Sequence, residues 1–149
     1  DKEHAIAQYK LGIMSEKGLG VAKDDTEAAQ WYQLAAAQGY APAQYNLGYM
    51  YENGLGVAQN DAEAAQWYQL AAAQEHAAAE FNLGKMYEEG RGVTQNYAKA
   101  VRLWRLAAKK IHPDAAAATA ALQRLGVRVE EGPRYFVTHN GWKGVGQNK

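Results

Sequence analysis

The strongest constraint on the fold is a repeat with a period of 36 residues. A Leu-Gly dipeptide, a methionine and a Gly-x-Gly-Val segment each return at this step. The segments 24–38 and 60–74 differ at only two positions, so chance similarity is not a credible explanation. Units of this length bury their apolar faces by stacking on one another, and the sequence therefore predicts a solenoid. The recurring elements are Leu11-Gly12, Leu47-Gly48 and Leu83-Gly84, then Met14, Met50 and Met86, then Gly18 to Val21, Gly54 to Val57 and Gly90 to Val93.

Each repeat is expected to form two helices joined by a glycine-containing loop. In the second repeat, Ala43, Leu47 and Met50 fall on one helical face. Gly54 ends that helix, because glycine adopts positive φ without steric cost. Asn60 or Asp61 is expected to cap the next helix, whose buried face carries Ala64, Tyr68, Ala71 and Ala72. The predicted helices are 3–16, 25–38, 41–53, 61–74, 77–89, 97–110 and 113–125, with Pro42 and Pro113 in first turns.

The repeat divides the chain into a solenoid over residues 1–125 and a C-terminal extension over 126–149. We place the units at about 3–38, 39–74 and 75–110, followed by a capping helix within 111–125. The extension repeats nothing, and its alternating valines and Gly132-Pro133 suit either a small β-hairpin or an extended tail. Trp142 lies in this extension and is expected either to dock on the last helix or to contact a partner.

The unit Ala-x-x-x-Leu-Gly-x-Met-Tyr-x-x-Gly-x-Gly-Val, followed by Ala-Ala-x-Trp-Tyr-x-x-Ala-Ala, resembles the Sel1-like repeat, a relative of the tetratricopeptide repeat. The resemblance covers three units and the cap. It implies an all-α, right-handed α-solenoid of helix-turn-helix repeats, with the first helix of each unit lining a concave groove. The departures from the pattern are Ser15 for tyrosine, Glu75 and Ile111 for glycine, and Leu103-Trp104 for Trp-Tyr.

Composition and motifs exclude several other functions. Lys plus Arg and Asp plus Glu both number 16, so no basic excess favours nucleic acid. No apolar run is long enough for membrane insertion, and the absence of cysteine excludes disulfides. No nucleotide-binding, metalloprotease or serine-hydrolase motif is present, and we read the Gly-x-Gly loops as turns. His76 and His112 are expected on the surface rather than at a metal. We therefore expect no enzyme, no cofactor and no metal site.

A second face of each first helix is expected to line the groove. Aromatic rings with neighbouring amides suit peptide binding, although Tyr9, Tyr45 and Phe81 share one repeat position and equally suit packing between units. Changing Tyr49 and Asn46 to alanine is expected to weaken binding and to leave the melting temperature nearly unchanged. The predicted contact residues are Tyr9, Ile13, Tyr45, Asn46, Tyr49, Glu52, Asn53, Phe81, Asn82, Lys85 and Glu89.

The expected function is a non-catalytic protein–protein interaction module, acting as a bacterial adaptor that holds a protein or peptide. Two alternatives stay open: an immunity protein that neutralises a secreted toxin, and a regulatory segment of a larger enzyme. The chain begins at Asp1 rather than methionine, so we expect a processed form that has lost an export signal. The expected location is periplasmic or secreted, with the cytoplasm as the alternative, and a monomer is favoured.

Overall fold

The computed structural model describes residues 1–110, 112–129, 135–138 and 141–144. Within these residues the chain forms seven helices and one antiparallel pair of strands, in which Tyr135 is opposite Gly144. The hairpin is one of the two forms expected for the extension. The elements are α1 (Lys2–Lys17), α2 (Asp25–Ala37), α3 (Ala41–Asn53), α4 (Asp61–Ala73), α5 (Ala77–Glu89), α6 (Tyr97–Ala108), α7 (Asp114–Arg124), β1 (Tyr135–Thr138) and β2 (Gly141–Gly144).

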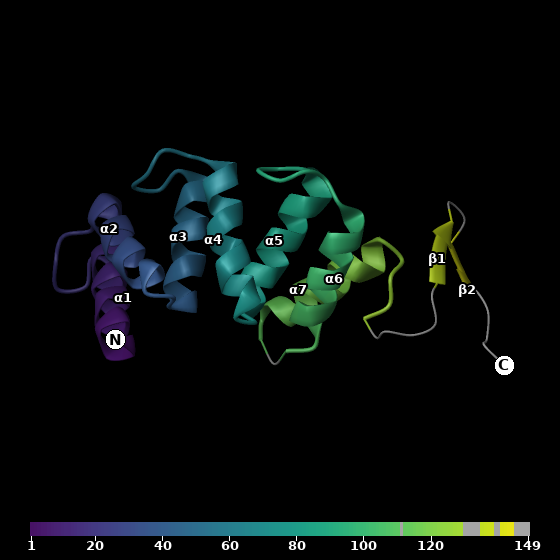
Figure 1. Cartoon of the computed structure of the whole chain (residues 1–149), viewed down its shortest axis with the longest axis horizontal. Coiled ribbons are helices and arrows are strands. Elements are labelled where there is room, and N and C mark those ends of the chain that lie inside the picture. Colours follow the sequence, from purple (N-terminus) through teal and green to yellow (C-terminus); the bar gives the residue numbers. More distant parts are fainter. Residues whose placement is uncertain (111, 130–134, 139–140, 145–149) are drawn as a thin grey trace.

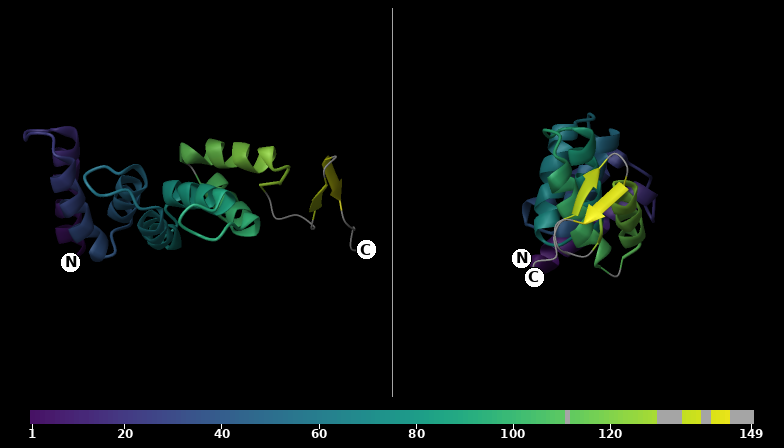
Figure 2. Two further views of the ribbon diagram at one scale, coloured as in Figure 1. Left: turned by 90° about the horizontal axis from the view of Figure 1, so that it is seen from above. Right: turned by 90° about the vertical axis from the view of Figure 1, so that its right-hand side faces the viewer.

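The helices form an all-α repeat solenoid, which confirms the predicted fold class. Helix pairs α1/α2, α3/α4 and α5/α6 follow one another along the long axis, and α7 packs on the last pair (Figure 1). In the end-on view the helix pairs lie behind one another, as stacked units must (Figure 2). Every predicted helix is present, with ends that differ by at most two residues. One detail differs: Pro113 is the residue before α7 rather than part of its first turn.

Polar caps and glycines fix where the helices begin and end. The side chains of Asp24, Asn60 and Asn96 accept a hydrogen bond from the backbone N–H three residues later, at the start of α2, α4 and α6. Asn60, not Asp61, is therefore the cap. Gly54 ends α3 in the left-handed region with a φ of 64°, where its N–H bonds to the Met50 carbonyl.

The glycine of each Leu-Gly dipeptide allows an aromatic ring to lie against the first helix. A Cβ atom at Gly48 would stand 2.8 Å from the Tyr68 ring, and one at Gly84 would stand 2.5 Å from Nε1 of Trp104. No side chain fits in that space. This contact explains why glycine recurs inside a helix, where it lowers intrinsic stability.

The second glycine of each later loop allows one unit to dock on the unit before it. A Cβ atom at Gly56 would lie 2.2 Å from the carbonyl oxygen of Asp25, at the start of α2. Gly92 has the same relation to Asp61, at the start of α4. Gly20 in the first unit has no such neighbour. The loops are therefore contacts between units as well as turns.

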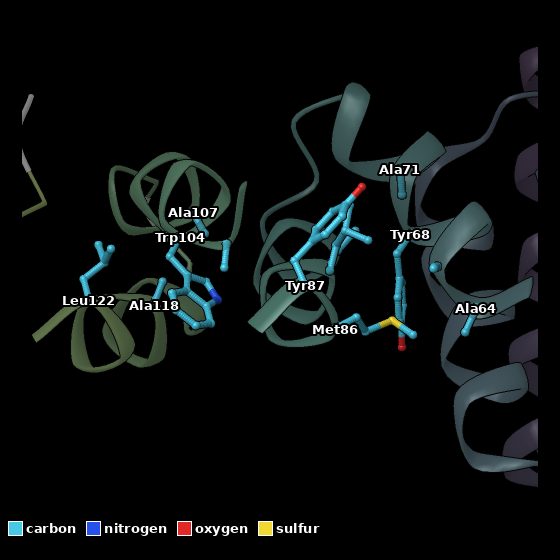
Figure 3. Packing of buried hydrophobic residues seen from close by; sticks show 13 residues of the cluster. Ala64, Tyr68, Ala71, Met86, Tyr87, Trp104, Ala107, Ala118 and Leu122 are labelled. Atoms are coloured by element: carbon cyan, nitrogen blue, oxygen red, sulfur yellow. The ribbon is translucent and has the colours of Figure 1, made fainter. Parts of the chain in front are cut away.

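Two apolar clusters fill the solenoid, and both are built largely from alanine. One joins the first two units around Tyr32 and Leu47, and the other extends from α4 to α7 around Tyr68 and Trp104 (Figure 3). Alanine faces let helices approach closely, and buried aromatic rings fill the space that remains. Met86 and Leu122 are fully or almost fully buried in the second cluster, so the predicted capping helix does close the core.

The first unit lacks one layer of this packing. Leu47 and Met50 on α3 are buried against α2, whereas the equivalent Leu11 and Met14 on α1 are 40% and 37% exposed. Among the described elements, no helix covers the outer side of α1. The first unit therefore packs differently from the later ones, and Ser15, which stands where they have tyrosine, is buried.

Candidate partner-binding surface

The predicted contact residues all lie on α1, α3 and α5, the first helices of the three units. We call the surface formed by these helices and α7 the first-helix surface. The four most accessible of these residues are Tyr49, Asn53, Lys85 and Glu89, all exposed. The others are half-buried: Tyr9, Ile13, Tyr45, Asn46, Glu52, Phe81 and Asn82.

A hollow of about 200 Å³ lies between α1 and α3 on this surface. Glu16 lines it from α1, and Tyr45, Asn46 and Tyr49 line it from α3. The Tyr49 ring is 43% exposed, although its centroid lies 6.5 Å from that of Tyr45. The hollow thus combines accessible aromatic surface, an amide and a carboxylate, which together can hold an extended peptide.

Tyr9 and Tyr45 have a second role, because each packs against the core and against the start of the next unit. The Tyr45 ring lies 5.7 Å from the Tyr68 ring and stacks on the His76 imidazole at 5.0 Å. Tyr9 packs in the same way against Tyr32 and Tyr40. The packing interpretation of this repeat position is therefore supported, and partner contact by these rings stays a prediction.

A second hollow, of about 310 Å³, lies between α5 and α7. Phe81 and Lys85 line it from α5, and alanines of α7 form the opposite wall. The Lys85 ammonium stands 5.9 Å from the Phe81 ring centroid, within the range of a cation–π contact. The hollow differs from the one between α1 and α3 in charge and in its wall of small side chains.

Hydrogen bonds beneath the first-helix surface tie the units together. Tyr68 donates to Glu52 at 2.9 Å and accepts from the Asn82 amide of the next unit at 3.3 Å. Burial raises the pKa of Tyr68, and the charge of Glu52 raises it further, so the phenol remains protonated and able to donate. Tyr32 donates to Glu16 in the same way in the first unit.

This network changes the expectation for three predicted contact residues. Asn82 donates within the protein, and the Asn46 amide lies beside Tyr32, where it lowers a pKa that burial raises. Glu52 accepts from Tyr68 and pairs with Arg91 at 2.9 Å. An Asn46→Ala change therefore alters the surroundings of the buried Tyr32 ring as well as the surface. Tyr49 remains the cleaner probe of the surface.

His76 differs from the expectation of a surface residue. It is half-buried at the start of α5, where Nδ1 accepts from the Ala79 N–H at 3.3 Å. Burial lowers the pKa of His76, and nearby His112 lowers it further. His112 itself is exposed beside Asp114, with 3.1 Å between Nδ1 and Oδ2.

Three further features concern metal binding, membrane insertion and Trp142. Among the described residues, no cluster of three or more potential ligands is arranged to hold a metal ion. No helix in the described ranges has the length and apolar character needed to cross a membrane. The side chain of Trp142 lies outside the part of the chain that is described.

Three Sel1 repeats match residues 5–40, 41–76 and 77–112. The chain belongs to the Sel1 repeat family. Sel1 repeat proteins generally mediate protein–protein interaction, and the Sel1 fold is typically a non-catalytic scaffold. Each matched range begins two residues after the start of the unit expected from the repeat.

Solved structures share this fold. The protein c5321, "a protective antigen present in uropathogenic Escherichia coli strains", has a TM-score of 0.78 and 35% identity over 82% of this chain and 26% of its own. A Sel1 repeat protein from Oxalobacter formigenes has a TM-score of 0.75 and 42% identity over 87% of this chain and 53% of its own. Cysteine rich protein B of Helicobacter pylori has a TM-score of 0.63 and 23% identity over 77% of this chain and 89% of its own, which shows the fold alone.

A curated relative matches over a single repeat. Chitin synthase regulatory factor 3 of Schizosaccharomyces pombe is 53% identical over 36 residues, which is 24% of this chain and 4% of that protein. The chain thus spans a small part of this relative and about a quarter and a half of the first two solved structures. A match of one Sel1 unit shows a shared building block rather than a shared activity.

Sequence reasoning missed the polar pair that links the two helices of each Sel1 unit. Gln74 donates to Gln44 at 2.9 Å, and in the third unit Lys110 pairs with Glu80 at 2.6 Å. Glu80 is fully buried, and a buried carboxylate without a paired cation is costly. The signal was available, because the two members are 30 residues apart in every unit and change together from Gln–Gln to Glu–Lys. The remaining pair is Gln8 with Gln38.

Proposed function

We propose that the chain is an adaptor that binds a protein or peptide along its first-helix surface. The observation that supports this most is the hollow between α1 and α3, where Tyr49 presents exposed aromatic surface beside Asn46. Tyrosine rings supply large contact area at small entropic cost and dominate many protein interfaces. The tyrosine rings and carboxylates beneath this surface are held by hydrogen bonds that join the units. The surface is therefore ordered before a partner binds.

The proposal extends to a bacterial protein that works outside the cytoplasm. The two solved relatives with the higher identity are bacterial, and c5321 is described as a protective antigen, which supports an exposed location. Fractionation of the source cells with an antibody against this chain tests the location. Recovery of the chain in the cytoplasmic fraction alone would contradict it.

Affinity capture followed by a binding measurement on the purified partner tests the adaptor function. The change Tyr49→Ala is expected to raise the dissociation constant at least about tenfold, because it removes a central aromatic side chain. Since Tyr49 is exposed, the melting temperature of the variant is expected to stay within about 2 °C of that of the wild type.

Tyr97→Ala is the matched control, because Tyr97 is also an exposed tyrosine but lies at the start of α6 and lines neither hollow of the first-helix surface. It is expected to retain binding. If Tyr49→Ala binds the partner as tightly as the wild type while Tyr97→Ala does not, the first-helix surface is the wrong site.

A further inference from the structure

A third hollow lies between α4 and α6, on the second helices of adjacent units. Its volume is about 350 Å³. Leu103 and Leu106 of α6 and Ala72 of α4 supply apolar lining, and Tyr87 closes it from the end of α5. It shares no lining residue with the hollows on the first-helix surface. It therefore needs an explanation of its own.

The repeat explains why this hollow exists. Leu103 stands at the position of Trp31 and Trp67 in the first two units. Trp67 is half-buried and packs against the cluster of the first two units, so an indole occupies the space between α2 and α4. Leu103 packs against the next cluster from the same position but is much smaller. The hollow lies where the third unit lacks an indole.

The charge at the edge of the hollow changes together with its size. In the first unit, the Trp31 indole donates to the carboxylate of Glu27 at 3.4 Å. Lys99 replaces that glutamate in the third unit, with its ammonium 5.1 Å from the Tyr87 ring centroid. Arg102 replaces a glutamine, is exposed, and makes no ion pair with the described residues. This edge is therefore acidic in the first unit and basic in the third.

We propose that this hollow holds an aromatic side chain of a protein partner, with a carboxylate next to it that pairs with Arg102 and Lys99. The apolar lining matches a ring, because the same space in the neighbouring unit holds one. The two cations favour an adjacent Asp or Glu, since each is accessible and Arg102 forms no ion pair within the described residues. The result is a second contact surface, independent of the first-helix surface and of the function proposed for it.

Two tetrapeptides test the proposal on the full chain. The probe is acetyl-Gly-Trp-Glu-Gly-amide, and its control is the same peptide with glutamine for glutamate. In ¹H–¹⁵N spectra of the labelled protein, the probe is expected to shift Ala72, Leu103 and Leu106 saturably, with millimolar affinity as befits one buried side chain. The glutamine peptide is expected to bind about twofold to fivefold more weakly, the usual contribution of an exposed ion pair.

Two variants separate the role of the hollow from that of its charge. Leu103→Trp restores the residue of the other units, so it is expected to fold normally and to weaken binding at least about tenfold, because it fills the space. Arg102→Gln leaves the core untouched and is expected to abolish the preference for the glutamate peptide. The proposal is overturned if the probe shifts no residue of the hollow, if Leu103→Trp binds it equally well while folded, or if Arg102→Gln keeps the full preference.

Discussion

In the second unit, a buried glutamine, Gln44, accepts a hydrogen bond from Gln74, whereas in the third unit the same two positions hold Glu80 and Lys110. Both arrangements satisfy a polar group in the core of the helix pair. In the described part of the chain, no buried side-chain nitrogen or oxygen lacks a hydrogen-bond partner. The difference teaches that the repeat conserves a requirement for pairing rather than a particular residue, because an unpaired buried polar group is costly.

The buried aromatic position of the second helix also satisfies its polar group differently in the two units. Tyr68 in the second unit donates to Glu52, but Trp104 in the third unit donates through Nε1 to the Phe81 carbonyl at 3.1 Å. The equivalent carboxylate, Glu88, is then available to Arg124 of α7. The third unit thus differs where its neighbour is a capping helix rather than another unit.

Replacing Lys110 by alanine is expected to give the largest difference between the two units. The change leaves the buried Glu80 carboxylate without its ion-pair partner, which typically costs about 3–5 kcal/mol. The equivalent change Gln74→Ala leaves only a neutral amide without a partner, at a cost of about 1 kcal/mol. Urea unfolding followed by circular dichroism measures both free energies of unfolding.

A double variant tests the cause of that loss. Glu80→Gln with Lys110→Gln rebuilds the second unit's pair in the third, and its stability is expected to lie within about 1 kcal/mol of the wild type. Equal losses for Lys110→Ala and Gln74→Ala would show that the ion pair has no special role.

The next effect concerns the ends of the second helices and has the opposite sign. Glu75 has a φ of 62°, the left-handed region, where the first unit has Gly39 with a φ of 85°. A side chain there costs about 1 kcal/mol or more, so Glu75→Gly is expected to stabilise the protein by about that amount. Gly39→Ala is expected to destabilise it similarly. Thermal unfolding of the pair decides the matter, and a lower melting temperature for Glu75→Gly would contradict the strain.

The repeat made the helices and their order predictable, because period and glycine positions are local properties. The exposure of Leu11 could not be read from the repeat alone, since Leu47 has the same sequence context and is buried. What differs is the neighbouring unit, which only the stacked structure supplies. The role of Gly84 was hidden for the same reason: the ring that excludes a side chain there belongs to a different helix.

The candidate surface was predictable only in part. Helical spacing placed Tyr49 on an accessible face, and it is exposed. Spacing cannot show that Asn82 and Glu52 are engaged by Tyr68, because those contacts join residues 14 and 16 positions apart on different helices. Comparing equivalent positions between units, rather than faces within one helix, is what reveals such pairs.

The start of α5 differs from the start of α3 in its response to pH. His76 is half-buried, and burial lowers its pKa below the unfolded value of about 6.5. The unfolded chain then binds more protons, so stability is complete above about pH 6.5 and falls as the pH decreases below it. His112 and Asp114 also act on this ring, in opposite directions.

His76→Tyr introduces the residue found at the start of α3, Tyr40, and removes this titration. Between about pH 7.5 and about pH 5.5 the wild type is expected to lose a few degrees more melting temperature than the variant, less than about 4 °C. All other ionisable groups of the chain are unchanged in the variant, so the difference between the two proteins reports on His76. A parallel decline in the two proteins would mean that His76 is not coupled to folding.

The smallest expected effect is a difference in stability between breaking the ion pair of Glu88 and breaking that of Glu52. Arg124 pairs with Glu88 at 2.7 Å, but its side chain is 57% exposed, so Arg124→Ala is expected to cost about 0.2–1 kcal/mol. Arg91 pairs with Glu52 and is 33% exposed, and Arg91→Ala is expected to cost more. In about 1 M salt the loss for Arg124→Ala is expected to vanish, because charges at the surface are screened, while part of the loss for Arg91→Ala persists. If salt reduces both losses equally, the ion pair between the third unit and α7 is no more exposed to solvent than the ion pair between the second and third units.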